Sequence, residues 1–233
     1  MWPARLEWAG RVGLKDGAEM PIGGAMRVFW AILGVLWLAV VIAGFAVLGR
    51  WDNEPGAAAR ASAQWPAGSH IARDTTRPTL VMLAHPRCSC TRASIEELAE
   101  VMARAAHRPK AFVVFIKPGG VGAEWEKTDL WQSAAAIPDV TVLRDEHGLE
   151  AQRFGGETSG QTFLYDADGS LLFTGGTTAS RGHAGDNAGR ASLVALLNQH
   201  AASASGTPVF GCPLFGQHDR EPATTTRYDV GTY

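Results

Sequence analysis

The chain has 233 residues, a length that fits one folded domain with appended segments. Hydrophobic residues make up 46% and charged residues 19%, which are ordinary values for a globular protein and exclude collagen-like and wholly disordered chains. The net charge is −2 and the sequence has no Lys/Arg cluster, so we expect no nucleic-acid partner.

An apolar run near the start of the chain predicts a transmembrane helix. Residues Val28–Leu48 contain no charge and no proline, and as a helix they would span about 30 Å, the thickness of a bilayer core. Four basic residues precede this run, whereas Arg50 and Arg60 follow it. This asymmetry predicts that residues 1–27 are a short cytoplasmic segment. The following domain would then lie in the periplasm, tethered to a bacterial inner membrane by a single span through the lipid bilayer.

Composition divides the remainder into three parts. Residues 49–76 are rich in Ala, Gly, Ser and Pro, which is typical of a flexible linker. Residues 77–202 carry the periodic apolar patterns of a folded domain. Residues 203–233 form a C-terminal extension that contains Cys212 and becomes polar from Gln217, so we expect its end to be disordered.

Strands and helices alternate through the predicted domain. Apolar runs predict strands, and amphipathic or capped stretches predict helices. In chain order these are a strand over 79–85, a helix from 89, a strand over 111–118, a helix over 124–136, a strand over 139–145 and a helix over 147–154. This alternation predicts an α/β domain with a mostly parallel sheet.

A hairpin and a final helix complete the predicted domain. The Asp168-Gly169 pair between two apolar runs is a strong hairpin signal, and it adds two antiparallel strands to the sheet. Asp186 is positioned to cap a helix that runs to His200. The expected architecture is therefore a mixed sheet flanked by helices.

Two of the three cysteines stand one residue apart, as Cys88-Ser89-Cys90. With Ser89 as the helix cap, both sulfurs would lie at the helix N-terminus, where backbone N–H groups and the helix dipole stabilise a thiolate. We expect both side chains to be exposed, with Cys88 as the attacking thiolate and Cys90 as the resolving thiol.

Cys212 has two interpretations. It follows the last predicted helix, from where the chain can return to the sheet. It is therefore either a resolving thiol in place of Cys90 or a structural, buried cysteine.

The order of these elements, and the stretches LVMLAHPRCSCTRASIEEL and SGQTFLYDADGSLLFTGG, resemble the active-site turn and hairpin of thioredoxin-like proteins. The motifs HPRCSCTRAS, GGTTASRGHAGDN and TPVFGCPLF resemble the RedB-like group of membrane-anchored bacterial thioredoxin-like proteins. The resemblance implies a thioredoxin-like fold, thiol–disulfide oxidoreductase activity on protein thiols or disulfides, and no cofactor.

The chain departs from the thioredoxin pattern at two places. An ungapped match puts Cys90 at the second cysteine of the family's Cys-X-X-Cys and Arg87 at the first. Gln161 stands where the family has its cis-proline. Around the cysteines we expect a rim of polar residues: His85, Arg87, Gln161, Arg181 and His183.

Two other functions fit the same residues. Cys88 and Cys90, with Cys212, His85 or His183 as a further ligand, form a donor set suited to Cu(I), as in copper-delivery proteins on this scaffold. The alternative cofactor is therefore copper. The third hypothesis is a membrane-tethered interaction domain without catalysis.

Overall fold

The computed structural model describes residues 22–216. The chain divides into two compact units, the first ending at Leu48 and the second beginning at Gly49. Helix α1 (Ile22–Asp52) is the one helix among the described residues that is long and apolar enough to cross a membrane. Its span Gly23–Asp52 reaches a mean hydropathy of 2.7, and its apolar side chains are exposed. This helix is a candidate membrane anchor or signal sequence. Most of the predicted cytoplasmic segment (residues 1–21) and the predicted disordered end (from Gln217) lie outside the described residues.

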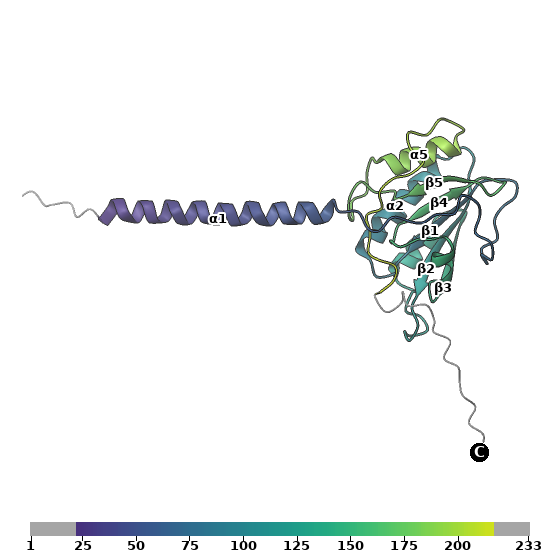
Figure 1. Ribbon diagram of the computed structural model, residues 1–233, viewed down its shortest axis with the longest axis horizontal. Coiled ribbons are helices and arrows are strands. Elements are labelled where there is room, and N and C mark those ends of the chain that lie inside the picture. Colours follow the sequence, from purple (N-terminus) through teal and green to yellow (C-terminus); the bar gives the residue numbers. More distant parts are fainter. Residues whose placement is uncertain (1–21, 217–233) are drawn as a thin grey trace, which may run out of the picture. The chain divides into compact units, whose positions relative to one another are not determined.

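A five-stranded mixed sheet forms the centre of the second unit, in the order β3-β2-β1-β4-β5 (Figure 1). Strands β1, β2 and β3 are parallel, whereas β4 is antiparallel to β1 and β5 is antiparallel to β4. Their bounds are β1 (Thr79–Ala84), β2 (Lys110–Lys117), β3 (Val140–Glu146), β4 (Thr162–Tyr165) and β5 (Leu171–Gly175). This topology is the thioredoxin-like fold expected from the sequence.

Four helices follow the predicted order, with differences at their starts. They are α2 (Ser89–Arg104), α3 (Asp129–Ala135), α4 (Leu149–Arg153) and α5 (Ala188–Leu197). The predicted cap of the last helix was wrong by one residue. Asn187 is the N-cap, because its side chain accepts a hydrogen bond from Arg190 N, whereas the Asp186 carboxylate pairs with the Arg190 guanidinium.

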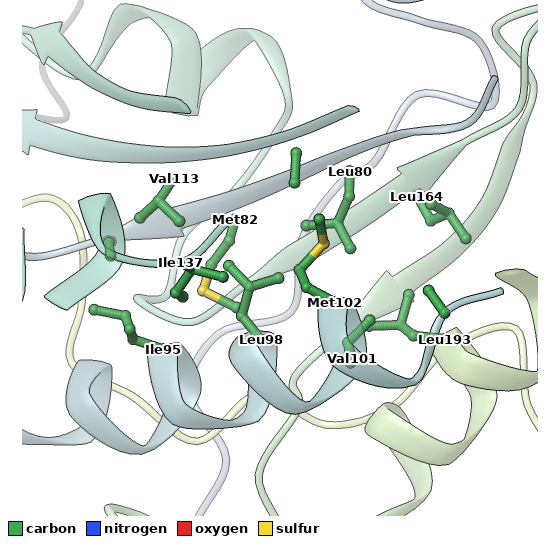
Figure 2. Close-up of a cluster of buried hydrophobic side chains, with 14 of the residues drawn as sticks. Leu80, Met82, Ile95, Leu98, Val101, Met102, Val113, Ile137, Leu164 and Leu193 are labelled. Carbon is green, nitrogen blue, oxygen red and sulfur yellow. The ribbon is translucent and has the colours of Figure 1, made fainter. Parts of the chain in front are cut away.

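One face of the sheet packs against α2, α3 and α5 (Figure 2). Ile95, Leu98 and Val101 recur on one side of α2 and are fully or almost fully buried against the strands. Leu193 and Leu197 of α5 join the same cluster. The helical spacing of these apolar residues therefore fixes which side of α2 faces the sheet and how its first turn is presented.

The other face of the sheet is covered largely by segments outside the predicted domain. Trp65 lies in the predicted linker, and its ring contacts those of Phe154 and Tyr165, each at 5.1 Å between centroids. Trp65 N also donates a hydrogen bond to Gly169 O. This part of the chain therefore differs from the expected flexible linker, because its aromatic and apolar side chains cover a sheet face that would otherwise be exposed to water.

The C-terminal extension also packs onto this second face. Leu214 and Phe215 are 3% and 8% exposed and belong to the same apolar cluster as Phe154. The segment, at the yellow end of the colour scale, runs from the α5 side of the domain toward the β2–β3 side (Figure 1). The folded unit therefore includes residues on both sides of the predicted 77–202 domain.

Candidate active site

The turn between β1 and α2 places Cys88 at the start of a helix. Cys88 is the N-cap residue, with extended backbone angles of φ −96° and ψ 121°, and Cys90 is the second residue of α2. The first backbone N–H groups of a helix have no partner within it. Those of Thr91 and Cys90 lie close enough to the Cys88 sulfur to favour its charged form. The predicted position of both cysteines at a helix start is confirmed, but the predicted cap was wrong by one residue, because Cys88 is the N-cap and Ser89 is the first residue of α2.

The predicted exposure of these cysteines was wrong. Cys88 is 2% exposed and Cys90 is 4% exposed, whereas Cys212 is half-buried. The C-terminal extension passes over the helix start and excludes water from it. A helix N-terminus is an exposed position only where no other segment packs on it, and the local sequence does not contain that information.

Cys212 lies directly against Cys88. The distance from Cys88 Sγ to Cys212 Sγ is 2.7 Å, closer than two non-bonded sulfur atoms usually approach, although 124 residues separate them in sequence. Two interactions hold the backbone around Cys212: Ser159 N donates to Cys212 O at 2.9 Å, and Arg181 Nη1 donates to Gly211 O at 2.6 Å. The geometry therefore brings together the two sulfurs that are far apart in the chain.

Cys88 and Cys212 have very different pKa values, so the proton that the two sulfurs share lies on Cys212. The hydrogen bond with Cys212, opposed by burial and assisted by backbone N–H groups, lowers the pKa of Cys88 to about 5. The same hydrogen bond and burial raise the pKa of Cys212 well above its usual range. Burial also raises the pKa of Cys90, a shift that the charge of Arg181 partly opposes. At neutral pH Cys88 is therefore the thiolate, while Cys212 and Cys90 are thiols.

A first prediction concerns the pH profile of Cys88 alkylation. Because only the thiolate reacts, the rate with iodoacetamide is expected to be half-maximal near pH 5 and about tenfold lower at pH 4 than at pH 7. In Cys212→Ala the thiol donor is lost, so the midpoint should move upward, toward the ordinary cysteine pKa of about 8.5. The measurement is mass spectrometry of the peptide that contains Cys88. An unchanged midpoint in Cys212→Ala would contradict the assigned cause.

His85 and Arg87 line the turn before Cys88. His85 is half-buried, and burial lowers its pKa, so the ring is neutral at pH 7. His85 Nδ1 accepts a hydrogen bond from Arg87 N at 3.2 Å. Both side chains contact Trp125, the His85 ring at 5.5 Å and the Arg87 guanidinium at 5.2 Å from the indole centroid. Trp125 therefore holds the turn in place from the β2–α3 connection.

The other predicted rim residues differ in position. Arg181 lies beside the Cys212 segment and also donates from Nε to Trp51 O at 3.1 Å. His183 is exposed, and its Nδ1 is hydrogen-bonded to Arg181 O at 2.7 Å. Gln161 is 1% exposed, and its Nε2 donates to Thr174 Oγ1 at 2.9 Å, so it lies within the sheet.

A buried network that the sequence did not indicate joins the turn before α2 to the segment that leads into β4. Thr91 Oγ1 donates to His85 O at 3.0 Å and lies 2.7 Å from Ser159 Oγ, which accepts from His85 N at 2.8 Å. Ser159 also holds Cys212 through its backbone. The network therefore fixes the position of Cys212 relative to α2. Its sequence signal is weak, because Thr91 and Ser159 are ordinary polar residues 68 positions apart.

Among residues 22–216, no group of three or more His, Cys, Asp and Glu side chains is arranged to hold a metal ion. The expected copper set of Cys88, Cys90 and His183 therefore does not occur as a preformed cluster in the described part of the chain. Two sulfurs in contact, one of them a thiolate, are placed so that a disulfide between them can end a thiol–disulfide exchange.

No family model and no curated protein matches this chain. Among solved structures, it is similar to a hypothetical protein from Sinorhizobium meliloti 1021, with a TM-score of 0.50 and 21% identity over 67% of this chain and 96% of the other. It is also similar to an uncharacterized conserved protein from Geobacillus kaustophilus, with a TM-score of 0.50 and 18% identity over 70% and 92% of the two chains.

A third similar structure is the exposed lipoprotein thioredoxin Etrx1 of Streptococcus pneumoniae strain TIGR4, with a TM-score of 0.39 and 19% identity over 54% of this chain and 86% of that one. At these identities the likeness is one of fold. The thioredoxin-like fold of the domain that carries Cys88, Cys90 and Cys212 is shown by its strand order and by the order of its helices.

Proposed function

We propose that this protein is a thiol–disulfide oxidoreductase in which Cys88 is the attacking thiolate and Cys212 is the resolving thiol. The observation that carries the proposal is the 2.7 Å contact between the two sulfurs at the start of α2. The low pKa of Cys88 supports it, because a thiolate at neutral pH is the reactive species.

The chemistry uses only these two sulfurs and a disulfide of another protein. The Cys88 thiolate attacks one client sulfur, a Cys88–client bond forms, and the second client sulfur leaves as a thiolate. Cys212, losing its proton to that leaving group, then attacks Cys88 Sγ. The Cys88–Cys212 bond forms, the client leaves as a dithiol, and two electrons have passed from the protein to the client. The same steps in reverse oxidise a client dithiol.

Cys90 remains an alternative resolving thiol. It also interacts with Cys88, and its pKa is raised, as is that of Cys212. A disulfide between Cys88 and Cys90 would close a very small ring, which is far from relaxed disulfide geometry. Because 124 residues separate Cys88 from Cys212, a disulfide between them closes a large ring that does not restrict its geometry. Cys212 is therefore the favoured partner.

The location of the domain is part of the proposal. Helix α1 would anchor the protein in a bacterial inner membrane, with the thioredoxin-like domain in the periplasm, as in the RedB-like group that the sequence resembles. An oxidising compartment is where a client disulfide persists.

Disulfide mapping tests the proposed pair. The full chain in detergent is oxidised with glutathione disulfide, its free thiols are alkylated and its peptides are analysed by mass spectrometry. We expect a Cys88–Cys212 disulfide and an alkylated Cys90, and the same disulfide in Cys90→Ser. A Cys88–Cys90 disulfide would assign the reaction to the Cys-X-Cys pair. The absence of any disulfide would refute the proposal and favour the copper-binding or non-catalytic hypotheses.

A further inference from the structure

A short strand of the C-terminal extension lies over the reactive sulfur. Pro213 and Thr158 form an antiparallel bridge, flanked by two backbone hydrogen bonds of 2.9 Å, Ser159 N to Cys212 O and Leu214 N to Glu157 O. Residues 211–214 are thus added edge to edge to residues 157–159. Addition of an extended strand to such an edge is also how proteins bind peptides of other chains.

Cys212 occupies the place that a client sulfur needs. In thiol–disulfide exchange, the attacked sulfur must contact the attacking thiolate directly. Cys88 is 2% exposed, and Cys212 Sγ lies directly against its Sγ. A client disulfide can therefore react only when the Cys212 segment moves aside and a client sulfur takes its position.

We propose that residues 157–159 are the binding edge for an extended, cysteine-containing peptide of the client, and that residues 211–214 are an internal occupant that the client displaces. This inference rests on the proposed function, since it requires Cys88 to be the attacking thiolate. The client strand would use the same backbone groups, Ser159 N–H and Glu157 C=O, that now bind Cys212 and Leu214.

The occupant also indicates which client sequences fit. A Cβ atom at Gly211 would lie 2.0 Å from Ser159 O, so the residue before the client cysteine must be very small. Pro213 is exposed, and its position tolerates any side chain. Leu214 is 3% exposed within an apolar cluster, so the second residue after the cysteine should be apolar. The expected client motif is Gly-Cys-any-apolar.

Return of the occupant would complete the reaction. After Cys88 has formed the mixed disulfide, the Cys212 thiol approaches as residues 211–214 compete for the edge. Cys212, after losing its proton to the first client thiolate, attacks Cys88 Sγ and breaks the bond to the second client sulfur, which leaves as a thiolate. Arg181, which holds Gly211 O, assists the return of the segment. The return of residues 211–214 to the edge would then both resolve the mixed disulfide and release the client.

The Gly211→Val substitution tests displacement. It is made in the full chain with Cys212→Ser, so that the loss of the Cys212 thiol is common to all samples. The valine side chain should push the segment off Ser159 O, and alkylation of Cys88 by iodoacetamide should rise at least about tenfold, because local opening limits the reaction of a buried thiol. Gly122→Val is the matched control, since nothing lies within 4 Å of its added Cβ atom, and it should leave the rate unchanged.

A second measurement tests the binding edge itself. The probe is a synthetic peptide with the sequence of residues 208–216, used as its symmetric disulfide, against the Cys212→Ser/Gly211→Val chain. It should form a mixed disulfide with Cys88 at least about tenfold faster than the same peptide carrying Gly211→Val. Equal rates for the two peptides would overturn the assigned edge.

The two proposals fail in different ways. If mapping finds the Cys88–Cys212 disulfide but Gly211→Val does not speed the alkylation of Cys88, the redox pair stands and the internal occupant is refuted. If Gly211→Val speeds alkylation but no Cys88–Cys212 disulfide forms, the segment covers Cys88 without resolving it. Amide hydrogen exchange of β1, unchanged between Gly211→Val and its control, would show that the domain remains folded.

Discussion

Replacing Cys88 by serine is expected to reduce thiol–disulfide exchange to the rate observed without protein. A serine hydroxyl stays protonated at neutral pH and cannot attack a disulfide, so no mixed disulfide forms. The effect should be complete because Cys88 is the thiol whose pKa is lowered, whereas those of Cys90 and Cys212 are raised. The measurement is the reduction of a fluorescent disulfide peptide by the full chain, with dithiothreitol as the source of electrons.

The other two cysteines supply the matched controls. Cys212→Ser should slow the first attack at neutral pH, because loss of the Cys212 thiol raises the pKa of Cys88, and it should prevent resolution. A covalent complex of Cys88 with one client should therefore accumulate and be detectable on a non-reducing gel. Cys90→Ser should keep most of the wild-type rate. If Cys90→Ser instead trapped the complex while Cys212→Ser turned over normally, the resolving role would belong to Cys90.

Replacing Glu97 by alanine is expected to destabilise the domain by about 3 kcal/mol, the lower end of the usual cost of breaking a buried ion pair, because Arg190 keeps its pair with the exposed Asp186 carboxylate. Glu97 is 2% exposed, and its Oε2 lies 2.8 Å from Nη1 of Arg190, whose side chain is 9% exposed. The carboxylate also accepts hydrogen bonds from Gly185 N and Asn187 Nδ2. Glu97 therefore ties α2 to both the start of α5 and the loop that carries Arg181.

Thermal unfolding followed by circular dichroism measures this loss. Because each kcal/mol moves the melting temperature of a domain of this size by about 2–4 °C, a fall of roughly 6–12 °C is expected. Glu100→Ala is the control on the same helix: its partner Arg104 lies at 2.8 Å, but both side chains are about half exposed, and the pair should contribute about 1 kcal/mol or less. Equal melting temperatures for the two variants would show that the Glu97 pair adds no net stability.

Features set by neighbouring residues could be predicted from the sequence. The continuous apolar run Thr79–Ala84 forms a fully buried strand between β2 and β4, and the helical spacing of Ile95, Leu98 and Val101 forms the buried side of α2. The start of α3 was predicted too early, because residues 124–128 carry helix-compatible side chains yet are held in turns. Propensity is a weak guide over such short stretches.

Segments that lack a pattern of their own were the least predictable. The composition of the stretch around Trp65 is typical of a linker, yet it lies along the sheet, because the second face offers more apolar surface than the helix predicted over 147–154 covers. The same surface holds Leu214 and Phe215. Both segments pack here because the second face of the sheet is apolar, and neither segment has a sequence pattern that would indicate it.

The sequence by itself determined that Cys88 stands at the start of a helix after a buried strand, since that position depends on residues adjacent in the chain. Only the tertiary structure decided which sulfur faces it and whether water reaches it. Cys212 is 124 residues away, and its contact arises from the backbone bond to Ser159 and the burial of Leu214. Such long-range packing depends on surfaces that form only when the whole domain has folded, so it cannot be predicted from a local sequence pattern.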